Sequence, residues 1–448
     1  MTELRPFQFE GIRQIYEFGG CALLADEQGL GKTVQSCAWI QKIPRHRPAV
    51  VVCPSSVKYA WQVEFNGFDL HAEVLEGRKP PRVRRLPGDI VILNYQILDS
   101  WLDVLIDSNP QCVIFDEIQY LKNPSSKRTK AAFELVQGVP SRIGLSGTPI
   151  PKELIDIWAP LAIIRPDLYP DRFKFAWHFT KPAQVFGRWI YKGARNTQEL
   201  KETLMQECMI RRLKVDVAPE LPDKIRKVVP LRLDTYAEYR RAKHDFIGWL
   251  KTQSPGRAYR ARKSQALVRV GYLLRLVARL KMPMVIQWLK DWQEYHPGEK
   301  LVCLTMHKQV IQILRKLFPN SVVVDGEVTG RLRHEAVRKF TNNPKIQFFF
   351  GNWKAAGVGL NLQVACNLAS LDFPWTPGDL LQGEDRVHRI GQKDHVVIHY
   401  LVALFTLEEK LMKILQKRAD VLNLVLNEDE DTDLNIFIDL LEDIKEAA

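Results

Sequence analysis

A glycine-rich stretch near the start of the chain carries residue types that bind phosphate. The string CALLADEQGLGKT places an apolar run before Gly29, Gly31, Lys32 and Thr33, and the helix-like VQSCAWIQK follows. Small residues let backbone N–H groups approach phosphate oxygens, and the start of a helix adds a partial positive charge. In such a loop the lysine reaches the β- and γ-phosphates and the threonine hydroxyl reaches Mg²⁺. The general motif has glycine where this chain has Asp26, so a glycine-rich turn with an incidental lysine stays open as the alternative.

Two adjacent carboxylates farther along the chain supply the acidic groups that such a loop lacks. Asp116 and Glu117 end the apolar run CVIFDE, which predicts a buried strand whose carboxyl end lies at the sheet edge where ligands bind. Asp116 fits the acid that holds Mg²⁺, usually through water, and Glu117 fits the carboxylate that orients or deprotonates an attacking water. A pair of acids at the end of a strand is common by itself. Together with the loop, it predicts a nucleoside triphosphatase site with Lys32, Asp116 and Glu117 as catalytic residues and Thr33 and Asp116 as Mg²⁺ ligands.

The elements that must position these residues form two blocks of α/β pattern. Short apolar runs alternate with longer helical stretches in both blocks, and the runs are CALLA, AVVVC, DIVIL, CVIFDE, SRIGLSG, KLVCLTM, SVVVDG, IQFFFGN, LASLDF and VVIHYLV. Continuous apolar runs of this kind are typical of buried parallel strands. The segment between the blocks contains aromatic and basic stretches with a helical pattern, which prolines interrupt. We therefore predict an α/β fold with lobes at 1–150 and 285–406, a helical insertion at 151–284, and a helix with an acidic tail at 407–448.

Composition limits the class of protein. The 448 residues are 46% hydrophobic and 26% charged, which excludes a disordered or collagen-like chain. No apolar run approaches the roughly 18 uncharged residues needed to cross a bilayer. The N-terminal sequence MTELRPFQFEG also lacks a cationic segment followed by an apolar one. We therefore expect a soluble, unexported protein of the cytoplasm or the nucleus.

The net charge of +12 is unevenly distributed along the chain. From Ala419 onward ten acids stand against one base, whereas residues 257–281 contain eight Lys or Arg and no acid. A basic body with an acidic tail favours a polyanionic partner, and the candidate DNA contacts in the basic stretch are Arg257, Arg260, Arg262, Lys263 and Arg269. A solvated helix face stays open as the alternative. The tail at 428–446 either competes for the same basic surface, docks a partner or only aids solubility.

Taken in order, these motifs resemble the Swi/Snf family of superfamily-two helicase-like ATPases, which are DNA-dependent motors. The family's early motifs are similar to LRPFQFEGI, DEQGLGKT, VVCPSSVKYAWQVEF, ILNY, DEIQYLKN and LSGTPI. The resemblance implies two RecA-like lobes with ATP between them, Gln8 bonded to the adenine edge, and Asp26 as a regular member of the phosphate loop. Gln119 stands where the family more commonly has histidine, which leaves the two carboxylates unchanged.

The second block resembles the late motifs of the same family in KAAGVGLNLQVA, LDFPWTPGDLLQGEDRVHRIGQ and VVIHYLVA. Arg386 and Arg389 are three residues apart, which predicts one helical turn with both side chains on one face. By resemblance they are arginine fingers, which stabilise charge on the transferred phosphoryl group when the lobes close. A pair of surface arginines is the alternative. Gly359 and Gln382 are expected, also by resemblance, to take part in ATP binding.

Other residues are assigned to DNA and to the link between lobes by the same resemblance. Lys354 and Trp375 match positions expected near DNA, although an ordinary core tryptophan is the alternative for Trp375. The string RRLKVDVAPELPDK, with Arg211, Arg212 and Lys214, resembles the family's connector between lobes.

The branch of the family is indicated by the strings EDRVHRIGQ, IHYLVA, ARLKMPMVIQWL and MHKQ. They are most similar to the HepA-related branch, which contains annealing helicases, and we expect a minimal, monomeric motor. The resemblance implies an ATP-dependent translocase on double-stranded or branched DNA, with Mg²⁺ and ATP as cofactors and DNA-bound proteins as further partners. Alternatives are annealing or fork remodelling, displacement of nucleosomes or other proteins, an RNA helicase, and a non-enzymatic scaffold.

Overall fold

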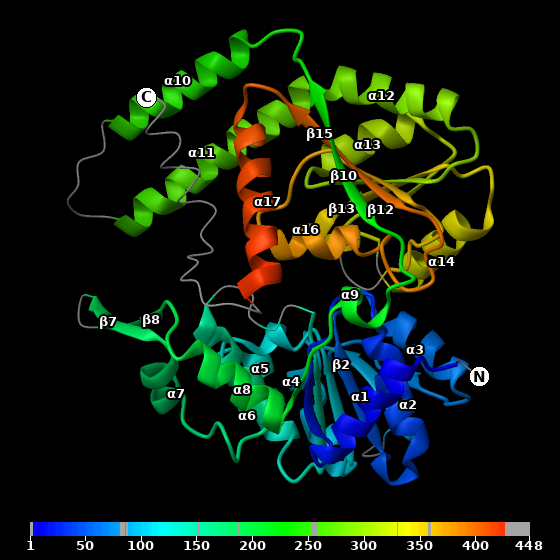
Figure 1. Cartoon of the computed structure of the whole chain (residues 1–448), viewed down its shortest axis with the longest axis vertical. Helices are drawn as coiled ribbons and strands as arrows, with labels where there is room; N and C mark the ends of the chain where they lie inside the picture. Colours follow the sequence, from blue (N-terminus) through cyan, green and yellow to red (C-terminus); the bar gives the residue numbers. More distant parts are fainter. Residues whose placement is uncertain are drawn as a thin grey trace. The chain divides into compact units, whose positions relative to one another are not determined.

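Figure 1 shows the fold as a computed structural model, which describes residues 3–80, 86, 88–147, 149, 153–185, 188–251, 259–328, 330–356 and 360–425. The chain forms two compact units: the first ends at Leu221, the second begins at Pro222, and residues 330–334 group with the first. The change of unit falls within the segment that the sequence predicts to be helical. The domain boundaries at 150, 284 and 406 stay predictions. No helix in the described ranges is long and apolar enough to span a bilayer.

A parallel sheet forms the centre of the first unit (Figure 1). In its described part the strands follow the order β3-β4-β2-β5-β6-β1-β9, and their bounds are β1 (Cys21–Leu24), β2 (Ala49–Cys53), β3 (Glu73–Val74), β4 (Ile90–Asn94), β5 (Cys112–Asp116), β6 (Ser141–Leu145) and β9 (Met209–Ile210). Every residue of β2 and β4 is buried, as expected for continuous apolar runs. Because all neighbouring strands are parallel, the residues that follow β1 and β5 lie at the same edge of the sheet.

Helices connect these strands. They are α1 (Pro6–Glu17), α2 (Lys32–Lys42), α3 (Lys58–Gly67), α4 (Leu98–Asp107), α5 (Lys127–Leu135), α6 (Trp158–Ile164), α7 (Arg172–Phe179), α8 (Thr197–Glu207) and α9 (Lys214–Val217). Short 3₁₀ turns lie at Pro44–His46, Ile118–Leu121 and Leu154–Ile157. An antiparallel hairpin of β7 (Lys181–Val185) and β8 (Arg188–Lys192) forms a sheet of its own beside α7 (Figure 1).

A second parallel sheet forms the centre of the second unit. In its described part the strand order is β10-β15-β14-β11-β13-β12, with bounds β10 (Lys224–Leu231), β11 (Leu301–Thr305), β12 (Ser321–Val324), β13 (Phe348–Asn352), β14 (Asn367–Ser370) and β15 (Val396–Ala403). The helices that follow or precede these strands are α10 (Ala237–Lys251), α11 (Tyr259–Leu280), α12 (Met282–Tyr295), α13 (Lys308–Leu317), α14 (Gly330–Asn342), α15 (Trp353–Ala356), α16 (Pro377–Glu384) and α17 (Leu407–Val425).

The prediction of two RecA-like lobes with parallel sheets is confirmed, and all ten predicted apolar runs contribute strands. Four strands inside the segment predicted to be helical were missed, namely the hairpin strands β7 and β8, and the strands β9 and β10. β9 has two residues, which is too short to show a pattern. β10 lies at one edge of the described sheet, and its sequence KIRKVVPL mixes three basic residues with Pro230. An edge strand tolerates proline and exposed polar residues, so its pattern differs from that of a buried strand.

A buried ion pair links α17 to the junction between α11 and α12. Lys281 Nζ donates to Glu408 Oε1 at 2.6 Å and to the carbonyl oxygen of Leu401 at 2.7 Å. The other oxygen of Glu408 accepts the backbone N–H of Ala403 at 2.9 Å. Both charged side chains are almost fully buried. Desolvation raises the pKa of Glu408, and the charge of Lys281 opposes that rise. Each charge therefore depends on its partner, because neither is solvated by water.

We predict that Glu408→Gln lowers the free energy of unfolding by about 3–5 kcal/mol, because Lys281 is then buried without a counter-charge. The neighbouring Glu409→Gln is the matched control. Glu409 pairs with Lys413 on the partly exposed side of α17, where such a pair contributes under about 1 kcal/mol. Urea unfolding followed by circular dichroism measures both variants. Equal stability of the two variants would contradict the assignment.

Candidate nucleotide-binding site

The loop between β1 and α2 has the backbone geometry of an anion site. Gly29 and Gly31 adopt positive φ values of 87° and 76°, a region that glycine enters without strain. Gly31 precedes the first residue of α2, and no side chain caps the helix there. A Cβ at Gly31 would be strained by the positive φ and would lie 2.5 Å from Gln8 Nε2, so glycine is favoured here. The first N–H groups of α2 are therefore not used by a capping side chain, which suits phosphate oxygens.

Lys32 begins α2, and its ammonium group turns back onto the loop. Its Nζ donates to the carbonyl oxygens of Asp26 at 2.7 Å and Glu27 at 3.3 Å. Desolvation lowers the pKa of Lys32, while the charges of Glu117, Asp26 and Asp116 oppose the change. Both predicted catalytic carboxylates thus act electrostatically on this lysine. Thr33 follows Lys32 in the first turn of α2 and is half-buried.

The two carboxylates lie directly at the end of β5. Asp116 is the last residue of the strand, and desolvation together with the charge of Glu117 raises the pKa of its carboxyl to about 6. Glu117 is buried and has a left-handed backbone, with φ 53° and ψ 55°, which costs conformational energy for a residue with a side chain. Its Oε2 accepts a hydrogen bond from Gln119 Nε2 at 2.5 Å. Gln119 thus contacts the candidate base itself.

Two aromatic residues that the sequence analysis did not single out hold Asp116. The Trp61 indole N–H donates to Asp116 Oδ2 at 2.9 Å, and the Tyr95 hydroxyl donates to the carbonyl oxygen of Asp116 at 2.7 Å. Both side chains are buried. Trp61 lies on α3, which follows β2, and β2 is the neighbour of β5 in the sheet. The indole bond occupies one carboxylate oxygen and lowers the pKa of Asp116, which leaves the other oxygen for a metal-bound water.

Gln8 is buried against the loop, and both ends of its side-chain amide are bonded to backbone. Its Nε2 donates to the carbonyl oxygen of Leu30 at 3.2 Å, and its Oε1 accepts the N–H of Arg5 at 3.0 Å. The proposed pair of hydrogen bonds to adenine would therefore replace these two bonds. Gln8 also packs against Gly31, so the position of its side chain depends on the conformation of the loop.

Asp26 is fully buried and forms an ion pair with the connector predicted from the sequence. Arg212 donates from Nε to Asp26 Oδ1 at 2.9 Å and from Nη2 to Oδ2 at 2.6 Å. Gln35 of α2 donates to the same carboxylate at 2.9 Å. A Cβ at Gly11 of α1 would collide with Gln35 and Arg212, so the two helices approach closely around the pair. Asp26 therefore supports the loop from behind, and its role in ATP binding stays a prediction.

Arg211 and Lys214, which lie close to Arg212 in the sequence, contact the same stretch of the loop. Arg211 Nη1 donates to the carbonyl oxygen of Ala25 at 2.9 Å, and desolvation lowers the pKa of Arg211. The backbone N–H of Lys214 donates to Glu27 Oε2 at 2.7 Å, and its ammonium group lies 3.8 Å from the other oxygen. The connector thus contacts three successive residues that lead into the phosphate loop.

In the second unit, the expected helical turn at the two candidate arginine fingers is wrong. α16 ends at Glu384, and both Arg386 and Arg389 lie in the turns that follow it. Arg386 is buried and donates from Nε to the carbonyl oxygen of Gln382 at 3.1 Å, whereas Arg389 is half-buried. Glu384, the last residue of α16, forms ion pairs with Lys224 and Arg226 of β10.

Those ion pairs form a buried network around Glu384. Lys224 Nζ lies 3.0 Å from its carboxylate, and Arg226 donates to both of its oxygens at 3.1 and 2.8 Å. The Tyr400 hydroxyl donates to it as well. Desolvation raises the pKa of Glu384, but the charges of Lys224 and Arg226 outweigh it and lower the pKa below its usual range. The network fixes the backbone that leads to Arg386.

The candidate DNA contacts are less fully described. Lys354 is exposed on α15, whereas Trp375 is half-buried and packs against the core of the second unit. Arg269 lies on α11 and is half-buried. The backbone of α11 also carries Arg260, Arg262 and Lys263. Three of the predictions fall outside the described residues: Arg257, Gly359 and the acidic tail 428–446.

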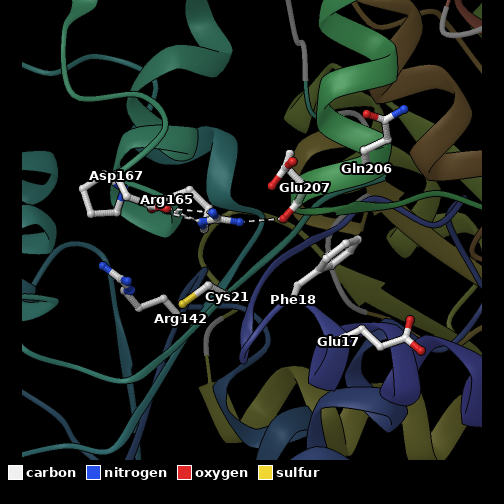
Figure 2. A pocket seen from close by; sticks show the side chains of 9 residues that line it. Glu17, Phe18, Cys21, Arg142, Arg165, Asp167, Gln206 and Glu207 are labelled. Atoms are coloured by element: carbon white, nitrogen blue, oxygen red, sulfur yellow. Dashed lines mark hydrogen bonds and ion pairs between the residues drawn. The ribbon is translucent and has the colours of Figure 1, made fainter.

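A cavity of about 470 Å³ lies elsewhere in the first unit (Figure 2). It opens at the other edge of the sheet, beside Cys21 and Arg142 near the starts of β1 and β6. Arg165 in its wall donates to the carboxylate of Asp167 and to the carbonyl oxygen of Glu207 (Figure 2). Among the described residues that line it, none is a predicted site residue. The cavity is therefore separate from the candidate nucleotide-binding site.

The residues around the loop between β1 and α2 fit a magnesium nucleotide. Uncapped N–H groups and Lys32 suit phosphate oxygens, and the Asp116 carboxylate with the Thr33 hydroxyl are oxygen ligands of the kind that Mg²⁺ prefers. All four groups belong to the first unit, and two parallel sheets place the whole chain in the RecA-like class of α/β proteins.

Comparison with known proteins identifies the family. The SNF2-related domain matches residues 13–253, and the helicase conserved C-terminal domain matches residues 281–391. The chain therefore belongs to the SNF2-related family of helicase-like ATPases. This finding confirms the resemblance to Swi/Snf proteins that the motifs indicated.

Several relatives are similar over nearly the whole chain. The SWI/SNF-related matrix-associated actin-dependent regulator of chromatin subfamily A-like protein 1 of Xenopus laevis is 31% identical, over 94% of this chain and 44% of that protein. The DNA annealing helicase and endonuclease ZRANB3 of Mus musculus is 30% identical, over 95% of this chain and 41% of that protein. The chain thus spans less than half the length of these curated relatives. A solved structure of the Sulfolobus solfataricus SWI2/SNF2 ATPase core in complex with dsDNA is 26% identical, with a TM-score of 0.43. The match covers 99% of this chain and 97% of that chain.

We predict that Trp61→Phe weakens Mg²⁺ binding about tenfold, because it removes a hydrogen bond that orients a metal ligand. Binding of Mn²⁺ in the presence of ADP, followed by electron paramagnetic resonance, measures this loss directly. The same change raises the pKa of Asp116 further, because the indole bond lowers it. Asp116 then becomes protonated at a higher pH, so the acidic limb of the ATPase pH profile moves to higher pH.

Trp101→Phe is the matched control for this prediction. Trp101 is also a buried tryptophan of the first unit, but its indole donates to the carbonyl oxygen of Gly77 at 2.9 Å. Its replacement should leave both Mn²⁺ affinity and the pH profile unchanged. Equal effects of the two substitutions would show that Trp61 acts through packing alone.

Proposed function

We propose that this chain is an ATP-dependent translocase on double-stranded DNA, which couples ATP hydrolysis to movement and so remodels DNA structures or DNA–protein complexes. The observation that carries the proposal is the meeting of Lys32, Asp116 and Glu117 at one sheet edge of an SNF2-family chain. A lysine at a helix start and a strand-terminal carboxylate pair are the parts that phosphoryl transfer to water needs. The non-enzymatic scaffold is disfavoured because each of these groups is present and positioned.

Each residue has a distinct part in the proposed chemistry. Bound Mg·ATP supplies the phosphoryl group and the metal charge that stabilises it. Lys32 would exchange its backbone carbonyl acceptors for phosphate oxygens, and Asp116 with Thr33 would hold the metal. Glu117 would accept the proton of the attacking water at one oxygen, while Gln119 holds the other. Gln8 and Asp26 would bind the adenine and support the loop, respectively.

We propose that the motor moves along double-stranded or branched DNA. Fork remodelling and annealing are the second proposed function. The support is the name of one relative, a DNA annealing helicase, and the basic stretch on and before α11. Sequence-independent grip on phosphates agrees with such a basic surface. A monomer, DNA-bound protein partners and a cytoplasmic or nuclear location are proposed with it. Phosphate release measured with single-stranded, duplex, forked and nucleosomal DNA and with RNA separates these activities.

We predict that Lys32→Ala abolishes ATP use and that Glu117→Gln binds ATP but loses turnover, because only the second change keeps the phosphate and metal contacts. Phosphate release and binding of a fluorescent ATP analogue measure the two effects. Lys42→Ala is the matched control, because Lys42 is the exposed lysine at the other end of α2. Turnover by Glu117→Gln at the rate of the unaltered protein would refute the role of Glu117.

We also predict that Arg386→Ala and Arg389→Ala each lower the DNA-stimulated kcat by about 10³ or more, if both act as full arginine fingers. Nucleotide affinity should change far less, because a finger acts on charge that develops during the reaction. Arg315→Ala on the exposed side of α13 is the control. An unchanged kcat in both single variants would leave them as ordinary surface or structural arginines.

A further inference from the structure

The first unit carries an exposed aromatic cluster that the proposed catalytic site does not use. We call it the hairpin patch, and its members are Arg172, Phe173 and Trp177 on α7 with Trp189 and Tyr191 on β8. The exposed fractions of Phe173, Trp177 and Trp189 are 54%, 37% and 44%. A contiguous patch of large apolar side chains in contact with water indicates an interaction site, whereas single exposed apolar residues do not.

The rings of the hairpin patch form one continuous surface. The ring centroids of Phe173 and Trp177 are 5.7 Å apart, and those of Trp177 and Trp189 are 5.1 Å apart. Phe173 and Trp177 are four residues apart and so share a face of α7. Phe175 and Ala176, on the other side of the helix, are buried in the core. The core therefore holds α7 in place without using Phe173 or Trp177.

The segment that carries the hairpin patch is strongly basic. Residues 172–195 contain six Lys or Arg and no Asp or Glu. The guanidinium of Arg172 lies 5.4 Å from the ring centroid of Tyr191. Nearby acids have other contacts, since Asp171 accepts two backbone N–H groups at the start of α7 and Glu199 is bonded to a histidine of that helix. The patch thus combines exposed aromatic rings with positive charge, which complements a polyanion with flat apolar groups.

We propose that the hairpin patch binds unpaired nucleotides of branched DNA, with bases stacked on Phe173, Trp177 and Trp189 and phosphates beside the basic side chains. Within a duplex, neighbouring base pairs cover the base faces, so only an unpaired strand offers them to an aromatic surface. An acidic protein would satisfy the charge but would leave the three adjoining exposed aromatic rings unexplained. This inference rests on the proposed function, because it gives the same DNA motor a preference for branched over blunt DNA.

The test uses the full chain with Phe173→Ser and Trp189→Ser combined. Fluorescence anisotropy measures affinity for a fork with unpaired dT arms and for a blunt duplex of equal length. We expect the fork affinity to fall about tenfold or more, since one or more stacked bases are lost. Affinity for the blunt duplex and the duplex-stimulated ATPase rate should stay unchanged. The double variant Phe173→Tyr and Trp189→Tyr keeps aromatic rings at both positions and should retain fork affinity.

Three further variants separate binding from folding. Tyr16→Ser removes an exposed aromatic side chain of α1, 63% exposed, and should leave fork affinity unchanged. If the serine variant melts at a lower temperature than the unaltered protein, Lys174→Gln replaces it as the decisive change. Lys174 is exposed on α7, and its loss should reduce the salt slope of fork binding by about 0.7. Lys130→Gln on the exposed side of α5 is its matched control.

The outcomes are distinct. Unchanged fork affinity overturns the inference and leaves an acidic protein as the occupant of the patch. An equal loss on fork and blunt duplex also overturns it, because the patch is then a general phosphate surface. If the unaltered chain shows no DNA-stimulated ATPase, the proposed function fails instead, while the fork-binding comparison still decides the role of the patch.

Discussion

The buried ion pair between Asp26 and Arg212 is the constraint on which the rest of the first unit's site depends. Two hydrogen bonds join the carboxylate to the guanidinium, and α1 and α2 pack around them. Asp26 is therefore held in place just before the glycines of the phosphate loop. A charged pair removed from water stabilises only one geometry well, because any displacement leaves both charges without partners. The loop starts from a fixed point, and its glycines supply the freedom that phosphate binding requires.

A similar arrangement recurs in the second unit. Glu384 is buried next to the segment that carries the candidate arginines, and Lys224 and Arg226 neutralise it. In both units, the basic partners come from a single stretch of chain, residues 211–226, which includes the change of unit at Leu221. A connector that only joined two lobes would need no such contacts. Its basic residues instead set the backbone beside the predicted catalytic groups of each unit.

Much of the fold and the main carboxylates could be predicted because the relevant signals are local. An apolar run fixes β5, and Asp116 and Glu117 follow it in the chain, so their position at the sheet edge follows from the strand itself. Contacts between distant segments left no such signal. Trp61 and Asp116 are 55 positions apart, and Arg212 and Asp26 are 186 apart. The helical turn expected at Arg386 was wrong, since α16 ends at Glu384, and the partners of Glu384 on β10 are likewise distant in the sequence.

The left-handed backbone of Glu117 places stability and chemistry in opposition at one residue. With φ 53° and ψ 55°, this position favours glycine or asparagine, which adopt that region at lower cost than glutamate. Selection for thermal stability alone would therefore replace the glutamate and remove the proposed base. A natural or engineered version of this chain in which Glu117 is replaced would then be more stable but catalytically inactive. Heat resistance in a collection of variants would then be a misleading guide to activity.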